Sequence, residues 1–186
     1  MPCRDSREDW GAMKKLFSKE EIDGAVRRLA SLIEKDFKGE AILFVCLLKG
    51  SFIFTSDLLR CIRNPSRVDF MRVASYGNAM QSKGAISITK DLEEDIEGKN
   101  VVIVEDIIDS GITLSSVRDL LKRRNPKTLK ICALVDKRAR REVEIEGDYV
   151  GFTINDGFIV GYGIDYAELY RNWPEIYVVE ENENVG

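Results

Sequence analysis

The chain has 186 residues, no histidine, and a net charge of −4 from 28 Lys and Arg against 32 Asp and Glu. This length suits one domain that buries most of its apolar surface, and the acidic balance argues weakly against a general nucleic-acid binder. The absence of histidine excludes Ser-His-Asp, Cys-His and His-metal chemistry, so any acid–base step falls to Asp, Glu, Lys, Tyr or Cys.

The cysteines and the apolar segments indicate the compartment. The four cysteines show no metal-ligand spacing, and Cys46 and Cys132 lie within apolar runs typical of core strands. The charged N-terminus lacks the apolar region of a signal peptide, and no run approaches the roughly 20 apolar residues that span a bilayer. We therefore expect a soluble, cytoplasmic protein with reduced cysteines.

Helix and strand patterns alternate along the chain. A capping box at Ser18-Lys19-Glu20-Glu21 begins a helix whose apolar residues recur at helical spacing. In chain order the sequence then predicts a helix end near 37–39, a strand at 41–48, a helix from 52, strands at 68–76 and 86–89, a strand from 101, a helix after 113, and strands at 129–136 and 149–154. Alternating strands and helices predict a doubly wound α/β sheet, whose ligand site lies at the carboxyl ends of the strands.

Two segments are expected to be loops. Residues 77–85 are polar and offer no core surface, so this loop should be mobile. Residues 155–170 are rich in Gly and aromatic side chains and have neither helical nor strand periodicity, which favours a loop shaped for a ligand.

The segment 101–113 is the most informative part of the chain. Four β-branched residues predict a strand buried on both faces, and the strand leads into three carboxylates: Glu105, Asp106 and Asp109. The next residues lie at a helix start, where unpaired backbone N–H groups favour an anion: Ser110, Gly111, Ile112 and Thr113. Carboxylates beside an anion would repel it unless they bind another group of the same ligand, such as hydroxyls or a metal ion. A sugar phosphate offers both the anion and the hydroxyls.

A purely structural interpretation of this segment explains only part of it. Negative charge at a helix N-terminus contributes roughly 0.3–1 kcal/mol, which would account for Asp109 and Ser110 as helix-capping residues. It does not explain two further carboxylates at the end of a buried strand.

The segment resembles the signature with which phosphoribosyltransferases bind 5-phosphoribosyl-1-diphosphate (PRPP): two acidic residues followed by Asp-Ser/Thr-Gly-x-Thr. Further stretches make the chain similar to the hypoxanthine (guanine) phosphoribosyltransferases from about residue 18 to about 180; they are 47–51, 68–70, 75–76, 136–138, 158–166 and 170–171. The resemblance implies one domain of the type I phosphoribosyltransferase kind. Its mostly parallel, twisted core would span about 38–154, a small hood would come from about 1–37 and 155–180, and the tail 181–186 should be disordered.

The resemblance assigns a role to each part of the motif. Glu105 and Asp106 would hold the ribose hydroxyls. The 5′-phosphate would lie in the turn formed by Asp109, Ser110, Gly111, Ile112 and Thr113, of which Ile112 fills a variable position whose backbone amide still serves. The Asp109 side chain would turn towards the purine N7 and act as the general base.

The resemblance also places pyrophosphate and metal ligands. Lys49 and Gly50 would form a pyrophosphate loop with a non-proline cis peptide bond before Lys49, although from the residues alone a plain helix start is equally open. Arg171 would donate to the pyrophosphate. The implied cofactor is Mg²⁺, with Asp165, Glu105 and Asp106 as its candidate ligands.

The purine site would combine one charged donor with an aromatic side chain. Lys137 would donate to the purine 6-oxo group, Phe158 would stack on the base, and the Ile159 backbone and Asp165 would lie at its edge. Ser75 and Tyr76 would belong to a loop that closes over the site and excludes water. From the residues alone, a solvated run with Arg138, Arg140 and Arg141 is the favoured interpretation of Lys137. Phe158 equally suits a core position, and 75–76 suits an ordinary hairpin.

The implied reaction is transfer of the 5-phosphoribosyl group to N9 of hypoxanthine, with guanine as a second candidate. Its expected partners are small-molecule substrates and further copies of the chain, as a homodimer or homotetramer, with no nucleic acid and no membrane. Two rivals stay open: a PRPP-family regulator that binds nucleotide and RNA, and a nucleotide-binding or assembly module. The purine preference is also open, because Gly157 stands where relatives commonly carry a charged residue and loosens the purine loop.

Overall fold

The computed structural model describes residues 13–75 and 86–179. Its elements are β1 (Met13–Phe17), α1 (Lys19–Phe37), β2 (Ile42–Leu47), α2 (Phe52–Cys61), β3 (Ser66–Ser75), β4 (Ile86–Lys90), β5 (Asn100–Ile108), α3 (Ile112–Lys122), β6 (Thr128–Lys137), β7 (Tyr149–Ile154), β8 (Phe158–Val160) and β9 (Ile176–Val179). The expected loop 77–85, the tail 181–186 and Tyr76 lie outside the described residues.

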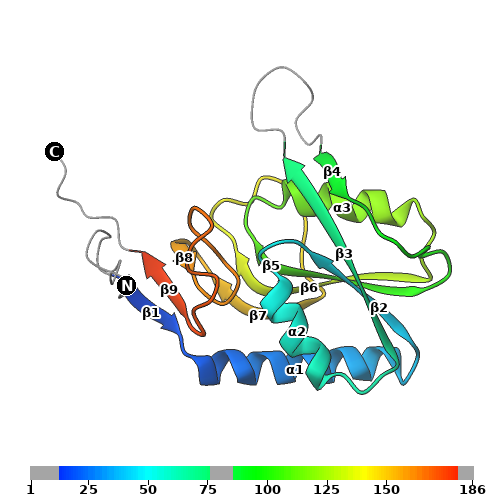
Figure 1. The fold of residues 1–186 in the computed structure, drawn as a ribbon, viewed down its shortest axis with the longest axis horizontal. Helices are drawn as coiled ribbons and strands as arrows, with labels where there is room; N and C mark the ends of the chain where they lie inside the picture. Colours follow the sequence, from blue (N-terminus) through cyan, green and yellow to red (C-terminus); the bar gives the residue numbers. More distant parts are fainter. Residues whose placement is uncertain (1–12, 76–85, 180–186) are drawn as a thin grey trace, which may run out of the picture.

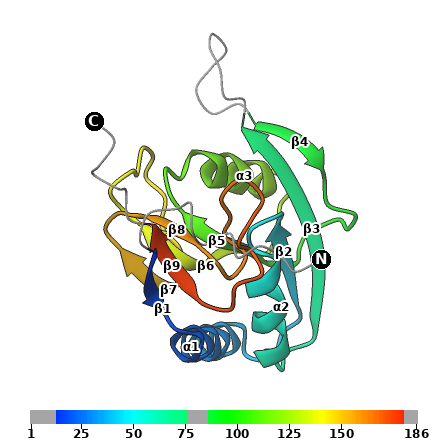
Figure 2. The same cartoon turned by 60° about the vertical axis from the view of Figure 1, so that its left-hand side comes forward.

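A six-stranded sheet forms the centre of the fold, with strand order β4-β3-β2-β5-β6-β7. All neighbours in it are parallel except β3 and β4, which pair antiparallel. A second, antiparallel sheet of order β1-β9-β8 lies beside β7 and joins the two ends of the described chain (Figures 1 and 2). The predicted doubly wound, mostly parallel sheet is confirmed.

Helices cover both faces of the sheet because its central strands are apolar on both sides. Every residue of β2 is buried. Phe44 packs on the face that carries α1 and α2, whereas Leu43 and Val45 pack on the face that carries α3 (Figure 1). Parallel strands covered on both faces are expected to be near-continuous apolar runs, and this is the pattern that the sequence predicted.

The first helix begins and ends at the predicted signals. The Ser18 hydroxyl accepts from the Glu21 backbone N–H at 3.2 Å, and the Glu21 carboxylate accepts from the Ser18 N–H at 2.8 Å, which completes the capping box. At the other end Lys38 takes a left-handed conformation with φ of 48°. No helix in the described part of the chain is long and apolar enough to cross a membrane.

Three strands, β1, β8 and β9, lie in regions where the sequence predicts none. β8 falls inside the expected loop 155–170, and β9 follows it; they have three and four residues. Such short strands show no measurable alternation, and β9 exists because it pairs with β1 and β8 on its two sides. Their pairing is therefore a product of tertiary contact that local periodicity does not reveal.

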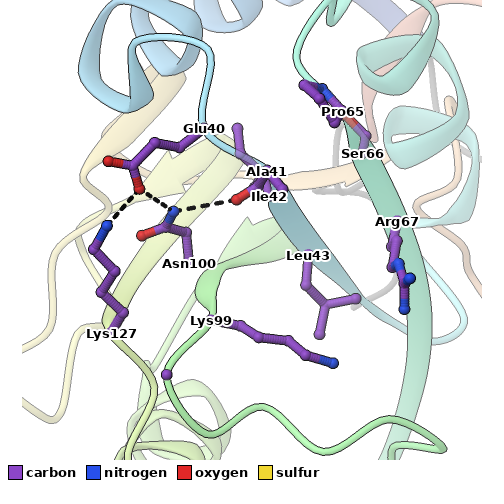
Figure 3. Close-up of a pocket in the computed structure, with 11 residues that line it drawn as sticks. Glu40, Ala41, Ile42, Leu43, Pro65, Ser66, Arg67, Lys99, Asn100 and Lys127 are labelled. Carbon is purple, nitrogen blue, oxygen red and sulfur yellow. Dashed lines mark hydrogen bonds and ion pairs between the residues drawn. The ribbon is translucent and has the colours of Figure 1, made fainter.

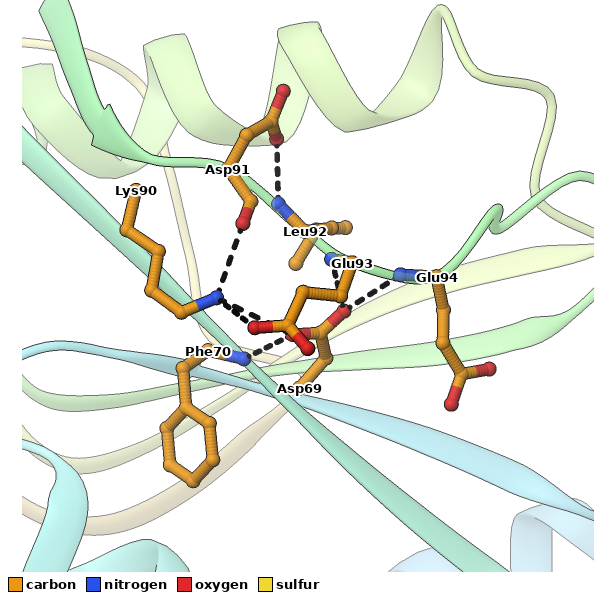
Figure 4. A network of polar contacts seen from close by, with 7 residues as sticks. All are labelled: Asp69, Phe70, Lys90, Asp91, Leu92, Glu93 and Glu94. Carbon is orange, nitrogen blue, oxygen red and sulfur yellow. Dashed lines mark hydrogen bonds and ion pairs between the residues drawn. The ribbon is translucent and has the colours of Figure 1, made fainter.

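One buried carboxylate fastens the segment after β4 to the sheet. Asp69 on β3 accepts hydrogen bonds from the backbone N–H groups of Phe70 at 2.7 Å, Glu93 at 2.7 Å and Glu94 at 3.0 Å, as Figure 4 shows. Burial raises the pKa of Asp69, but these three N–H groups and the nearby Lys90 ammonium outweigh it and hold the pKa below its usual range. Asp69 thus orders the connection that leads into β5.

Candidate active site

The predicted site residues gather where three neighbouring strands end. β2, β5 and β6 are adjacent and parallel, so their carboxyl ends meet at one edge of the sheet. Lys49 follows β2, Asp109 follows β5, and Lys137 is the last residue of β6. This is the edge at which doubly wound sheets bind ligands.

The loop after β2 approaches β5 very closely. The Leu48–Lys49 peptide bond is cis, as the resemblance implied. A Cβ atom added to Gly50 would lie 1.8 Å from Asp106 Oδ2, so only glycine leaves room for that carboxylate. On its other side, a Cβ on Gly163 would lie 2.1 Å from the Gly50 carbonyl oxygen. Three segments far apart in sequence are therefore in tight contact at this point.

The two carboxylates at the end of β5 lie side by side. Asp106 is 8% exposed. Burial, followed by the neighbouring Asp106 carboxylate, raises the pKa of Glu105 well above its usual range. The pair is thus a site where negative charge is concentrated and where a cation or hydroxyl donors would relieve the repulsion.

The turn after β5 presents backbone donors. Gly111 adopts φ of 80° and packs against Ile145, and α3 begins at the next residue. No side chain in the described part of the chain caps this helix; the Ile112 N–H has only a long contact of 3.4 Å to the Ser110 hydroxyl. The first turn of α3 therefore leaves backbone N–H groups without a side-chain cap, which is the condition under which a helix start can bind an anion.

An ion pair joins the turn to β6. Lys137 Nζ lies 3.2 Å from Asp109 Oδ2, and the lysine side chain is only 6% exposed. Asp109 Oδ1 is buried and finds no hydrogen-bond partner among the described residues. Lys137 is thus not a solvated lysine, and the pair presents one buried cation beside one unused carboxylate oxygen.

The segment between β8 and β9 folds back over the loop after β2. Arg171 donates to the Gly163 carbonyl at 2.8 Å and pairs with Asp165 at 2.8 Å. Glu168 Oε2 accepts from Lys49 Nζ at 2.9 Å and lies 3.4 Å from an Arg171 nitrogen. The two cations predicted to meet pyrophosphate therefore share one carboxylate oxygen.

The remaining predicted residues lie on β8 and at the end of β3. Phe158 is 44% exposed and makes an edge contact with Tyr166, with ring centroids 5.3 Å apart. Ile159 is buried in β8, and the Gly157 carbonyl lies 3.4 Å from Lys137 Nζ. Ser75 is the last residue of β3 and pairs with Ile86.

Sequence reasoning missed two polar residues at this edge. Arg141, for which a solvated basic run was one open interpretation, exposes only 18% of its side chain and bonds to the Asp109 backbone. Glu168 carried no signal of its pairing with Lys49. The available signal for Arg141 was its distance from Lys137 in sequence, because two side chains four residues apart around a turn can point in the same direction.

A separate hollow of about 610 Å³ lies at the opposite edge of the sheet, where β2, β3 and β5 begin (Figure 3). Three of its polar side chains bond to one another: Glu40 accepts from Lys127 at 2.5 Å and from Asn100 at 2.8 Å. None of the predicted site residues lines it, and we assign it no part in the chemistry.

Comparison with known proteins identifies the family of the chain. The phosphoribosyl transferase domain family matches residues 13–167. Hypoxanthine phosphoribosyltransferase of Buchnera aphidicola is 53% identical over 166 residues, 88% of this chain and 94% of that protein. Hypoxanthine-guanine phosphoribosyltransferase of Aquifex aeolicus is 47% identical over 170 residues, 91% of this chain and 96% of that protein. A crystal structure of a hypoxanthine-guanine phosphoribosyltransferase from Bacillus anthracis has a TM-score of 0.86 at 49% identity and covers 90% of this chain and 98% of that one. The chain therefore belongs to the phosphoribosyltransferase family, and within it to the hypoxanthine (guanine) phosphoribosyltransferases.

Proposed function

We propose that this chain transfers the 5-phosphoribosyl group of PRPP to N9 of hypoxanthine, with guanine as a second substrate, forming the nucleoside monophosphate and pyrophosphate in purine salvage. The observation that carries the proposal is the Asp109–Lys137 pair at 3.2 Å, next to the uncapped start of α3. In a 6-oxopurine, O6 and N7 are neighbours on one edge of the ring. A buried donor beside a buried acceptor matches that edge.

Asp109 is the proposed catalytic residue. Its Oδ2 is held by Lys137, while Oδ1 has no partner among the described residues and is free to accept the N7 proton. Loss of that proton as N9 attacks C1′ keeps the purine from accumulating positive charge. A positioned base of this kind contributes about 10²–10⁴-fold to the rate.

The other strand ends suit the PRPP half of the reaction. We assign the 5′-phosphate to the turn 109–113 and the ribose hydroxyls to Glu105 and Asp106. Lys49, the Gly50 backbone and Arg171 face the departing pyrophosphate, where negative charge grows as the ribose ionises. For these cations to bind it, Glu168 must give up its present contacts with them.

The donor set fits Mg²⁺. This ion keeps several waters and takes one or two protein carboxylates together with substrate phosphates, so no dedicated protein cage is needed. The described residues indeed hold no cluster of three or more metal-ligating side chains. The raised pKa of Glu105 beside Asp106 marks carboxylates that a cation would stabilise, and Asp165 is the third candidate. When bound with PRPP, the ion would neutralise charge on the leaving group.

The residues of β8 suit the purine. Phe158 offers an exposed ring for stacking, and we assign the Ile159 backbone and Asp165 to the ring edge. We assign Ser75 and Tyr76 to the loop that closes over the site. Gly157, whose carbonyl contacts Lys137, belongs to the segment that would distinguish hypoxanthine from guanine.

We infer a cytoplasmic protein that forms a homodimer or homotetramer from single-domain subunits, with the hood at about 1–37 and 155–180 over a core at about 38–154. Cys46, Cys61 and Cys132 are free thiols, as a reducing compartment favours. Phe52 on α2 and the β3 residues Val68 and Phe70 expose 46%, 39% and 37% of their surface, which supports a self-association surface. Light scattering after gel filtration measures the oligomer.

Pyrophosphate release tests the function. The protein is incubated with PRPP and Mg²⁺ and, in separate reactions, hypoxanthine, guanine, xanthine or adenine. We expect turnover with hypoxanthine, slower or equal turnover with guanine, and little with adenine. No release with any purine would support the nucleotide-binding alternatives, for which the named relatives give no support.

A further inference from the structure

The Arg141 guanidinium lies beneath Asp109 and Lys137, two of the residues assigned to the purine. Arg141 follows β6, and its side chain is 18% exposed. It donates to the backbone carbonyls of Asp109 at 3.1 Å and Ile108 at 3.4 Å on one side, and to that of Lys137 at 3.4 Å on the other. It also contacts the Ile145 carbonyl and forms an ion pair with Asp136, a carboxylate that is 4% exposed.

These acceptors belong to two different strands. Ile108 ends β5 and Asp109 directly follows it, whereas Asp136 and Lys137 end β6. The ladder between β5 and β6 stops here: its last paired residues are Ile108 and Asp136. Asp109 and Lys137 lie just beyond it, although Lys137 still pairs with Ile154 of β7. Arg141 therefore replaces the missing ladder bonds at the position where two functional side chains must be held apart by a fixed distance.

The segment that carries Arg141 also contacts the turn after β5. The Glu142 N–H donates to the Ser110 carbonyl at 3.0 Å. A Cβ on Gly111 would lie 3.2 Å from the Arg141 Cδ, so the arginine stem also packs against the anion-binding turn. The planar guanidinium can bond several acceptors at once in fixed directions, which a lysine ammonium cannot do.

We propose that Arg141 is a positioning residue for purine recognition: it fixes the spacing of the Asp109 carboxylate and the Lys137 ammonium so that they match N7 and O6 of a 6-oxopurine. Arg141 itself touches no substrate. The inference rests on the proposed function, because it concerns the residues assigned there to the purine.

Binding of two product nucleotides tests this role. IMP and AMP share the ribose and the phosphate and differ at the purine 6-position, so their ratio of dissociation constants reports purine recognition and does not depend on the fraction of protein that is active. In Arg141→Met we expect IMP binding to weaken about tenfold or more while AMP binding changes little, because misplacement by about 1 Å has effects of that order or larger. Arg140→Met is the matched control, since Arg140 is exposed and bonds to no described residue.

The possible outcomes distinguish failure of the proposed function from failure of the role proposed for Arg141. Wild-type protein that binds neither nucleotide selectively would overturn the proposed function. Selective wild-type protein with an equal IMP-to-AMP ratio in Arg141→Met and Arg140→Met would overturn the role of Arg141 alone. Because loss of Arg141 leaves the buried Asp136 carboxylate short of a partner, the double variant Asp136→Asn/Arg141→Met repeats the test if the single variant unfolds. Arg141→Lys should recover only part of the selectivity, since it keeps the charge without the planar fork.

Discussion

Gly50→Ala tests whether the loop after β2 and the β5 carboxylates act as one unit. The added methyl group would lie 1.8 Å from Asp106 Oδ2 and 2.5 Å from its Cγ, and such contacts below 3.0 Å do not occur in practice. Either the carboxylate or the loop must therefore move by at least about 1.2 Å. The loop cannot retreat freely, because a Cβ at Gly163 on its far side would already lie 2.1 Å from the Gly50 carbonyl oxygen.

Displacement of this size predicts a large kinetic effect. A misplacement of about 1 Å costs about 100-fold, so kcat/KM for PRPP should fall by about two orders of magnitude. Steady-state kinetics with PRPP varied at saturating hypoxanthine measures it, with the melting temperature recorded alongside.

Gly24→Ala is the matched control. Gly24 lies on the exposed side of α1 with no atom within 4 Å of an added Cβ, so alanine should leave kcat/KM unchanged and stabilise the helix by about 0.5–1 kcal/mol. If Gly50→Ala keeps kcat/KM within threefold of the wild type at an unchanged melting temperature, the packing argument is refuted.

Three further substitutions probe the site and the fold. Asp109→Asn should lower kcat about 100-fold or more with little change in PRPP affinity, measured by single-turnover kinetics and PRPP titration; unchanged turnover would exclude Asp109 as the base. Glu168→Gln should lower the KM for PRPP about two- to fivefold, because it frees Lys49 and Arg171 from a carboxylate whose pKa they hold below its usual range; a higher KM would mean that the pair assists binding. Asp69→Asn should cost about 2–3 kcal/mol at neutral pH, since it loses charge-assisted bonds to buried N–H groups. Because the folded pKa of Asp69 is depressed, its stabilisation is present above the unfolded pKa and lost as the pH falls through the folded value, so the melting-temperature gap from wild type should close in acid; a gap independent of pH would assign the loss to packing.

The sequence predicted the elements whose signals are local. Buried parallel strands such as β2 are apolar throughout, and the capping box at Ser18 depends on residues three apart. The gathering of Lys49, Asp109 and Lys137 also followed, because parallel strands in one sheet place their carboxyl ends together.

The contacts that join distant segments could not be predicted in this way. Residue type alone does not reveal that Arg141 is partly buried while Arg140 beside it is exposed, since a basic run is equally compatible with solvent. The approach of Gly163 to Gly50 spans more than a hundred residues, and the Lys49–Glu168 pair spans a similar distance. Such contacts depend on how the hood folds back onto the core. The strands β8 and β9 are too short for their sequence to predict this arrangement.

The three-stranded sheet has a consequence for synthesis of the protein. Its middle strand, β9, is the last element of the described chain, and it pairs with β1, the first. A ribosome releases the six strands of the central sheet before β9 has emerged, so that sheet can form while the hood is still one strand short. The segment bearing Asp165 and Arg171 lies between β8 and β9 and is anchored only when β9 arrives. The role proposed for Asp165 and Arg171 is therefore acquired only after β9 has been synthesised.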